Sequence, residues 1–531
     1  MASTEGIVAN RGIEPPPAIA ADQARSLLQQ IDQVLVELPA GGAQWDVHMI
    51  RFLHTTLDSD DLHVDQLPGH PGQLPLTAVY LKPLVETDRI IQDVYQPLYQ
   101  GAMTFAAAGN KSGIPVDRRT WLEHGQFTSD PQEIVKDLLT GAVVLLARGK
   151  DDAYIVREMA MPTRQVGEPT TEVALLAPKE GFVESAEVNL ALIRRRLATE
   201  KLRVKNFKVG RISKTRVCVL YLDGLTDPSI VRKICRGIEG MDVDYVRGAN
   251  DIEEILVGAT MTPFPLGERT ERTDRVVTAL VEGRVGILVD GTPFTLVLPT
   301  TLPELQRDSE VFIAGSVSST WVHLLRFAGL MLGTFAPAAY VALLGVSPEV
   351  LPPDLVVNVA VSRSGVPYSV LFEMLLFNFV LDVVIEATQQ APSSIGQTLT
   401  IVGSLIIGQA AVQAQLASQL VVVVLAITAI GTLLAVNLPF SYAVRIIKYP
   451  ITITSGVLGL YGVALSILGV CIHVASLKSL GTPYMTAVAP LHWREFVTYH
   501  VWTKGKSQRQ VRPTTFHPQD PVRMAKGGMD S

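Results

Sequence analysis

Charged side chains are scarce in this sequence of 531 residues. Asp, Glu, Lys and Arg make up 18% of it, where about 25% is typical of soluble proteins. Hydrophobic residues make up 48%, which excludes a chain that is disordered throughout. The net charge of −6 gives no sign of a nucleic-acid-binding protein, so nucleic acid is not an expected partner.

Cysteine is also rare, and the three positions, Cys218, Cys235 and Cys471, cannot pair fully. Their number excludes a small disulfide scaffold, and their spacing fits no metal site, which favours free thiols in a reducing compartment. Residues 1–17 contain no apolar stretch. We therefore expect no signal peptide and a cytoplasmic location for the large hydrophilic N-terminal region.

Charge is distributed unevenly along the chain. Between Leu324 and Met485 only 10 of 162 residues are charged, and 58 consecutive residues between Glu386 and Arg445 carry no charge. Each charge at the centre of a bilayer costs about 2.5–3.5 kcal/mol on insertion scales. This region is therefore predicted to be membrane, with the buried core of a large enzyme as the alternative. A full span takes roughly 20 apolar residues, and we expect helices near 324–345, 368–388, 395–416, 418–438 and 451–475.

The composition predicts an α/β soluble region of two small subdomains, followed by an all-α polytopic membrane domain. Spacing in the soluble region predicts a helix over Pro131–Leu139 capped by Asp130, and hairpins at Ala142–Arg157 and Val285–Leu298. The expected parts are an N-terminal extension, partly disordered and then helical (1–76), a first cytoplasmic α/β subdomain (77–165), a linker with a basic helix (166–199), a second cytoplasmic α/β subdomain (200–321), a transmembrane domain of four or five helices with one candidate re-entrant segment (322–485), and a basic C-terminal tail (486–531).

The soluble region contains no recognisable catalytic motif. Gly283-Arg284-Val285-Gly286 lacks the full dinucleotide-binding fingerprint, and no phosphate-binding loop or nucleophile elbow is present. The ten histidines are scattered, without metal-ligand spacing. We therefore expect a protein that is not an enzyme and that holds no metal and no cofactor.

Polar residues recur on one face of the second apolar segment. Asn378, Asp382, Glu386 and Gln389 follow helical spacing, and the same segment carries Glu373. Polar groups at membrane depth face protein or water. The acidic residues Glu373, Asp382 and Glu386 therefore predict a cation-attracting vestibule, with a helix lying at the membrane surface as the alternative.

The segment Ile395–Leu416 is uncharged but rich in glutamine. At 100° per residue, one mixed face collects the candidate pore-lining residues Thr398, Val402, Leu405, Gln409, Val412 and Leu416. Small residues on another face, Gly403, Ala410 and Ala414, allow close helix contact. This pattern suits a ring of identical helices around a pore with an apolar gate. An ordinary packed helix with glutamines bonding across helices remains the alternative.

Short motifs in a fixed order accompany these helices between about residues 130 and 490. They are Glu168-Pro169-Thr170-Thr171-Glu172, Gly181-Phe182-Val183-Glu184-Ser185, Asn189-Leu190-Ala191-Leu192-Ile193-Arg194, Pro263-Phe264-Pro265, Thr270-Glu271-Arg272, Glu282-Gly283-Arg284-Val285, Val289-Asp290-Gly291-Thr292-Pro293, Pro337-Ala338-Ala339-Tyr340-Val341, Gly396-Gln397, Ile407-Gly408-Gln409-Ala410-Ala411-Val412 and Gly481-Thr482-Pro483-Tyr484. Together they resemble the GerA-type spore germination protein family, the A subunits of nutrient germinant receptors.

The resemblance implies a multi-pass protein of the inner spore membrane, in contact with membrane lipid, whose two α/β subdomains face the cytoplasm. It implies a homopentamer that forms a nutrient-gated channel for monovalent cations. The implied partners are a transporter-like B subunit, which carries the nutrient site in this family, and a lipoprotein C subunit. The family's pore helix falls on Gly396–Leu416, with its narrowest apolar position near Leu405, which favours the pore interpretation.

The sequence departs from the family pattern in the polar helix. Asn378 stands where the family has a glutamate, and Ile385 and Gln390 replace arginines. Without those arginines, Asp382 and Glu386 have no evident ion-pair partner. Two alternatives therefore stay open, a non-conducting membrane scaffold for the receptor partner subunits and a paralogous channel that amplifies germination.

The side of the membrane that holds the C-terminus is not fixed by these patterns. The basic tail favours a cytoplasmic C-terminus and an even number of spans. Arg445 and Lys448 favour a cytoplasmic loop after the 418–438 segment. The five expected helices cannot satisfy both conditions.

Overall fold

The computed structural model describes the chain in two compact units, and each is treated by itself. Unit 1 comprises residues 1–165 and 187–206, and unit 2 comprises 166–186 and 207–531. The described residues are 45–67, 76–86, 125–147, 151–157, 178–258, 261–307, 316–390 and 408–486, with the single residues 90, 169, 172, 488, 489, 491, 516, 518 and 519.

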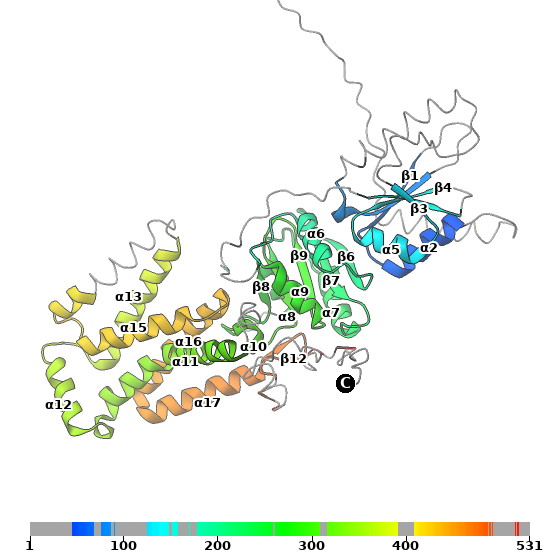
Figure 1. The fold of residues 1–531 in the computed structure, drawn as a ribbon. Coiled ribbons are helices and arrows are strands. Elements are labelled where there is room, and N and C mark those ends of the chain that lie inside the picture. Colours follow the sequence, from blue (N-terminus) through cyan, green and yellow to red (C-terminus); the bar gives the residue numbers. More distant parts are fainter. Residues whose placement is uncertain are drawn as a thin grey trace, which may run out of the picture. The chain divides into compact units, whose positions relative to one another are not determined.

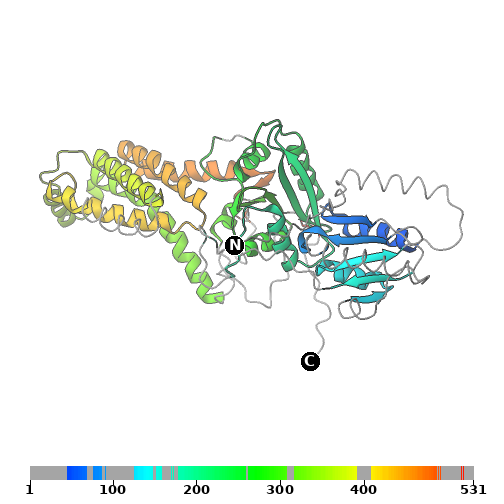
Figure 2. The same ribbon diagram turned by 90° about the horizontal axis from the view of Figure 1, so that it is seen from above.

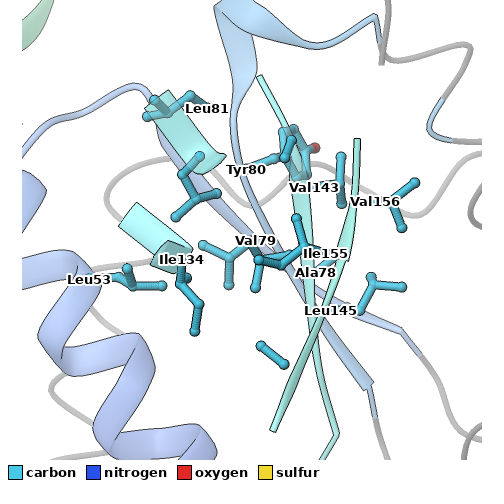
Figure 3. Packing of buried hydrophobic residues seen from close by; sticks show 14 of the residues in the cluster. Leu53, Ala78, Val79, Tyr80, Leu81, Ile134, Val143, Leu145, Ile155 and Val156 are labelled. Carbon is cyan, nitrogen blue, oxygen red and sulfur yellow. The ribbon is translucent and has the colours of Figure 1, made fainter. Parts of the chain in front are cut away.

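The first subdomain is an antiparallel sheet of five strands in the order β1-β2-β4-β5-β3. The strands are β1 (Leu62–Leu67), β2 (Leu76–Leu81), β3 (Gly125–Thr128), β4 (Val143–Ala147) and β5 (Ala153–Val156). Helices α2 (Trp45–Leu57) and α5 (Pro131–Leu139) pack on the sheet through one apolar cluster, and Figure 3 shows Leu53 and Ile134 beside Val79. As predicted, Asp130 caps α5 by accepting a hydrogen bond from the Gln132 amide, 3.0 Å.

Helix α6 (Ala186–Arg196) is the predicted basic helix, and its arginines are not equivalent. The Arg194 side chain is fully buried. It donates two hydrogen bonds to the Asp61 carboxylate, at 2.9 and 2.8 Å, and one to Ser59 Oγ at 2.9 Å. The segment that the sequence predicts to be a linker therefore contributes a buried ion pair to unit 1.

The second subdomain holds five strands in the order β6-β7-β9-β10-β8. The strands are β6 (Leu202–Val209), β7 (Thr215–Leu222), β8 (Glu268–Thr270), β9 (Val285–Val289) and β10 (Thr295–Leu298). Helices α7 (Pro228–Glu239) and α8 (Ala249–Val257) pack on the face of Val217, Val219 and Ile287. Helix α9 (Thr273–Val281) packs on the opposite face, against Gly286 (Figure 1). With both faces covered, the central strands are apolar throughout.

The C-terminal region is a bundle of apolar helices (Figures 1 and 2). Its elements are the short α10 (Leu302–Gln306) that precedes the bundle, then α11 (Ser316–Val341), α12 (Pro353–Ser362), α13 (Val370–Gln390), α15 (Gln419–Leu433), α16 (Leu438–Leu458) and α17 (Leu460–Ser476). Among the described residues one helix, Thr320–Val346, is long and apolar enough to cross a membrane. The predicted fold class, two α/β subdomains followed by a helical domain, is confirmed.

Two of the predicted helix boundaries are wrong. The predicted 418–438 helix ends at Leu433, and α16 begins at Leu438, where Asn437 is the N-cap and Pro439 occupies the first turn. The predicted 451–475 helix is two helices divided at Gly459, which has a positive φ of 61°. Arg445 and Lys448, predicted to mark a loop, lie inside α16 and are buried.

One end of the bundle, here called the proximal end, packs on the second subdomain. Phe264 and Leu266 of that subdomain share an apolar cluster with Leu330 of α11, Phe440 of α16 and Val474 of α17. Gln389, near the end of α13, accepts a hydrogen bond from Tyr442 at this end, 2.9 Å. Ser418, the N-cap of α15, instead contacts Tyr340 at the other, distal end. Gln389 and Ser418 therefore lie at opposite ends of the bundle.

After α17 the chain returns to the second subdomain. Ser479, in the short β11–β12 hairpin (Lys478–Ser479 and Thr482–Pro483), donates to the Leu266 carbonyl at 2.7 Å. Further on, the Phe516 ring lies 5.4 Å from the Arg284 guanidinium, and the Gln519 amide donates to Leu225 O at 2.8 Å. The described end of the tail and the second subdomain thus lie at the same end of the bundle.

Candidate functional site in the helical bundle

The predicted pore segment is described only at its C-terminal end. Thr398, Val402 and Leu405 lie outside the described residues, while Gln409 and Val412 lie in the helical residues 408–413. The helix then ends in a turn at Gln415, whose φ is 56°. Leu416 is 43% exposed and lies beyond the helix end. The helix therefore stops about one turn earlier than the sequence predicts.

Glu373 of α13 is fully buried in the distal half of the bundle. It forms an ion pair with Arg363 Nη1 at 2.9 Å and accepts a hydrogen bond from the Ser418 amide at 2.6 Å. Ser418 Oγ in turn lies 3.2 Å from the Tyr340 hydroxyl. One carboxylate thus connects α13 to the start of α15 and to the chain after α12, and its charge is neutralised by an arginine.

Asp382, one turn after Asn378 on α13, pairs with α16. Lys448 Nζ lies 2.8 Å from Asp382 Oδ1, and the Tyr449 hydroxyl donates to Asp382 Oδ2 at 2.5 Å. Lys448 is 1% exposed. The inference that Asp382 has lost its ion-pair partner is therefore wrong, because a lysine from α16 occupies that role.

The predicted acidic vestibule brings together fewer residues than the sequence suggests. Glu373 and Asp382 are paired with cations, and Glu386 is exposed and accepts a hydrogen bond from Gln390 of the next turn, 3.2 Å. Asn378 is buried, and its Oδ1 has no hydrogen-bond donor within the described part of the chain. The vestibule stays a prediction, with Glu386 as the member that is not ion-paired within the described residues.

A polar stripe runs along the buried face of α16. Its members recur at spacings of three and four residues, and each is at most 6% exposed: Asn437, Ser441, Arg445, Lys448, Thr452 and Ser455. Thr452 and Ser455 donate to carbonyls of the preceding turn. Buried polar and ionised groups inside a membrane bundle are costly and usually functional. Sequence reasoning missed this stripe, although the heptad-like spacing of its polar residues was a usable signal.

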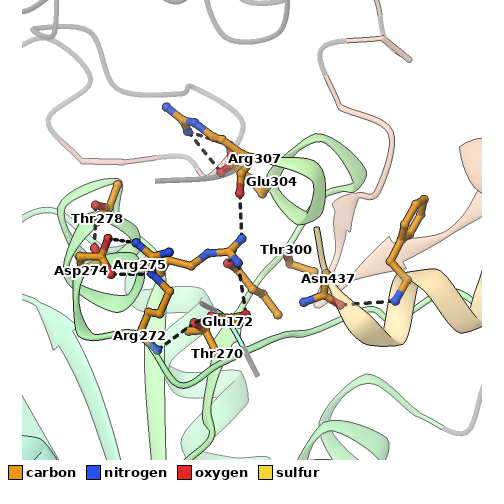
Figure 4. Close-up of polar contacts among 12 residues, drawn as sticks. Glu172, Thr270, Arg272, Asp274, Arg275, Thr278, Thr300, Glu304, Arg307 and Asn437 are labelled. Carbon is orange, nitrogen blue, oxygen red and sulfur yellow. Dashed lines mark hydrogen bonds and ion pairs between the residues drawn. The ribbon is translucent and has the colours of Figure 1, made fainter. Parts of the chain in front are cut away.

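A second polar network connects the sequence motifs within the second subdomain (Figure 4). Arg275 pairs with Glu172 at 3.3 Å and with Glu268 at 2.9 Å. Glu268 also binds Arg284 at 2.7 Å, and Arg307 bridges Glu282 and Glu304 at 2.9 and 3.1 Å. Residues of several motifs therefore lie together in a buried charge network beside α9 and α10.

Burial raises the pKa of two carboxyls in this network. The pKa of Glu172 lies above its usual value because burial disfavours the carboxylate, although the Arg275 cation opposes the shift. Burial raises the pKa of Glu282 to about 7, again against the attraction of Arg307. The network therefore takes up a proton as the pH falls through about 7.

The class of protein follows from the two regions. Two α/β subdomains are joined to an apolar helical bundle that holds buried ion pairs and, among the described residues, one helix long and apolar enough to cross a membrane. The chain belongs to the Bacillus/Clostridium GerA spore germination protein family, whose model matches residues 51–514. It is thus a spore germination protein that resembles the A subunits of germinant receptors.

Relatives agree with this assignment. Spore germination protein KA of Bacillus subtilis (strain 168) is 30% identical over 464 residues, covering 86% of this chain and 84% of the relative. Spore germination protein B1 of the same organism is 29% identical over 445 residues, covering 84% and 91%. Uncharacterized membrane protein YfkQ, also of B. subtilis, is 32% identical over 388 residues, covering 72% and 75%.

One solved structure is also similar. It is the N-terminal domain of the A subunit of the Bacillus megaterium spore germinant receptor GerK3, at 25% identity and a TM-score of 0.36. It covers 47% of this chain and 92% of that domain.

Proposed function

We propose that this protein is the A-type subunit of a spore germinant receptor and that it oligomerises in the inner spore membrane as a nutrient-gated channel for monovalent cations. The family assignment supports the receptor role. The partners proposed with it are a transporter-like B subunit and a lipoprotein C subunit. The N-terminal subdomains are proposed to face the cytoplasm.

The path of the chain through the helical bundle is the observation that supports the channel proposal. α11 and α16 run from the proximal to the distal end, and α13, α15 and α17 return. Since Gln389 and Ser418 lie at opposite ends, our proposal assigns one further passage to the uncharged segment 395–416. Six passages place both termini on one side of the membrane. The basic tail and the α15–α16 connection at the proximal end then lie on the same side, as the positive-inside rule favours. The proposed pore helix is that additional passage.

Exposed apolar side chains support placement in a membrane. Five apolar side chains are 56–62% exposed: Leu324 and Phe327 of α11, and Leu465, Leu468 and Ile472 of α17. Val457 and Tyr461, on either side of the α16–α17 turn, are 69% and 83% exposed. Extended exposed apolar surfaces mark sites that contact another protein or a membrane. In the proposed arrangement, lipid or a neighbouring subunit covers these side chains.

A non-conducting scaffold is the second candidate, and one observation favours it. Two of the three predicted vestibule carboxylates are neutralised, Glu373 by Arg363 and Asp382 by Lys448. A paired carboxylate attracts permeating cations weakly, because the partner cation cancels most of its field. The scaffold would hold B and C subunits in place without an axial pore. A paralogous channel that amplifies germination would keep the pore and lose only the nutrient response.

The channel and the scaffold differ in what the Leu405 face points toward. In the channel it points to an axis between identical subunits, and in the scaffold it points to a partner chain. A Leu405→Cys variant, made in a Cys471→Ser background, is oxidised in the membrane and analysed by non-reducing electrophoresis. Cys218 and Cys235 are buried and stay in place. If residue 405 lines an axis between identical subunits, covalent dimers of this chain form. A Leu465→Cys variant in the same background, on the exposed face of α17, serves as the matched control. Links to a different subunit, or none, would contradict the axial pore.

A further inference from the structure

A polar cleft of about 930 Å³ opens at the proximal end of the bundle. One wall consists of α8, the segment that precedes β8, and β8 itself, and it includes Glu253 and Arg269. The other wall consists of the end of α15, its short connection and the first two turns of α16, including Asn437 and Arg445. Among the described residues, none of those assigned to the pore face or to the acidic vestibule lines it.

The charges on the α8 wall are already matched. Arg247 pairs with Asp251 at 3.0 Å, and Arg269 lies 3.4 Å from Glu253. Glu253 also accepts hydrogen bonds from the Leu266 and Gly267 amides, at 3.1 and 2.7 Å. These contacts leave little unsatisfied charge on this side, apart from the exposed Glu254.

The α16 wall has donors without acceptors. Arg445 is 6% exposed, its guanidinium lies 5.5 Å from the Tyr442 ring, and no carboxylate of the described residues pairs with it. Its Nε has no hydrogen-bond partner there. Asn437 is 1% exposed, and while its Oδ1 caps the Phe440 amide at 3.4 Å, its Nδ2 donates to nothing in the described part.

The two donors are brought toward each other by helix geometry. Asn437 and Arg445 are eight residues apart, with Ser441 between them on the same stripe. Long side chains on a helix point back toward its N-terminus, and the contact of Arg445 with Tyr442, one turn earlier, has that direction. Asn437 is the N-cap of this 21-residue helix, and a helix N-terminus favours negative charge.

We propose that this cleft binds a phosphate group between Arg445 and the Asn437 amide. A buried cation without a partner is costly, and a planar guanidinium matches the paired oxygens of a phosphate. The cleft is far larger than one phosphate and continues past Leu433 and Leu438, which are 67% and 48% exposed. The phosphate therefore belongs to a larger molecule, either a phospholipid whose chains lie along these leucines or a soluble phosphorylated compound. The proposal does not depend on whether the protein conducts ions.

The test measures binding to the full chain in a phosphate-free detergent. Thermal unfolding is followed with inorganic phosphate, with glycerol 3-phosphate, and with micelles containing phosphatidylglycerol, at one ionic strength set with sodium chloride. A ligand of the native state raises the unfolding midpoint in a saturable way. Arg445→Gln removes the charged donor and is expected to weaken binding about tenfold to a hundredfold.

Asn437→Asp is the sharper variant, because aspartate keeps the capping oxygen of α16 and replaces only the free donor with a negative charge. It is expected to fold and to lose the midpoint shift even if Arg445→Gln fails to fold. Arg211→Gln is the matched control, since Arg211 is an exposed arginine that lies outside the cleft.

Each outcome decides the proposal. A shift with either soluble phosphate that Asn437→Asp abolishes supports a soluble ligand. A shift with phosphatidylglycerol alone, lost in the same variant and kept in Arg211→Gln, supports a lipid headgroup. No shift with any probe, or shifts that are equal in all variants, would overturn the proposal.

Discussion

The Lys448–Asp382 ion pair is the clearest residue-scale feature of the bundle. Lys448 is 1% exposed, and its Nζ lies 2.8 Å from Asp382 Oδ1 and 5.4 Å from the centre of the Tyr449 ring. Removing one member of a buried pair leaves an uncompensated charge and costs about 3–5 kcal/mol. Asp382 keeps the Tyr449 hydrogen bond and is 20% exposed on its side chain, so the lower value applies.

Lys448→Met is therefore expected to destabilise the bundle by about 3 kcal/mol. Thermal unfolding of the detergent-solubilised full chain measures this loss. The double variant Lys448→Met with Asp382→Asn removes both charges and should recover most of it. Equal stability of Lys448→Met and the wild type would show that the pair contributes nothing.

Glu282 gives the second residue-scale prediction, which concerns pH. Its pKa is raised from 4.5 to about 7 by burial. The native state then binds more protons than the unfolded chain between these values. The contribution of this group to stability is full below pH 4.5 and is lost as the pH rises through about 7.

Glu282→Gln is expected to flatten this dependence. Arg307 keeps Glu304 as a partner in the variant, so folding should persist. The difference in unfolding midpoint between variant and wild type should shift in favour of the variant from pH 5 to pH 8. A constant difference across this range would exclude Glu282 as the titrating group.

At the scale of elements, the crossing of α11 and α15 depends on glycine. A Cβ atom on Gly431 would lie within 2.6 Å of backbone atoms of Gly333 and near the Gly329 carbonyl. Backbone atoms cannot move aside as a flexible side chain would. The two helices therefore approach at a distance that only glycine permits.

Gly431→Ala is expected to cost about 1–3 kcal/mol, the range of overpacked sites, and to lie near its upper end. Gly469→Ala in α17 is the matched control, because no atom lies within 4 Å of a Cβ there. Unfolding of the two variants in the same detergent gives the comparison. Similar midpoints for both would contradict a glycine-dependent crossing.

Helix boundaries show what sequence reasoning could and could not provide. The cap of α5 at Asp130 and the β9–β10 hairpin follow from local turn chemistry, and both were predictable. The break between α15 and α16 was not predicted, because Leu434, Ala435 and Val436 are as apolar as the helices around them. Close contact was expected at Gly403, Ala410 and Ala414, whereas the described glycine contact is between α11 and α15.

The partners of buried charges lay beyond sequence reasoning for a different reason. Arg363 and Glu373 are ten residues apart, but Asp382 and Lys448 are separated by 66 residues. Helical periodicity places residues on a face without saying which helix that face meets. The polar face of α13 was predictable, and its partner helix α16 became visible only in the packed bundle.

At the scale of the whole molecule, the features that bear on the proposed function lie in unit 2. The second subdomain, the α15–α16 connection and the described tail residues Phe516 and Gln519 lie at one end of the bundle. Under the proposal of six passages, the conflict between the basic tail and the charges near residue 445 disappears, because one even number of passages meets both conditions. Composition alone could not show it, since the 451–475 segment counts as one helix in the sequence and is two in the structure.

Cation release from liposomes tests the channel proposal most directly. The full chain is reconstituted with and without partner subunits as wild type, Leu405→Ala and Leu465→Ala, the last being an exposed position on α17. Shortening an apolar gate eases its wetting, so Leu405→Ala should leak while the wild type and Leu465→Ala stay closed until stimulated. If none of the three conducts under any condition while the complex still assembles, the channel is contradicted and the scaffold takes its place.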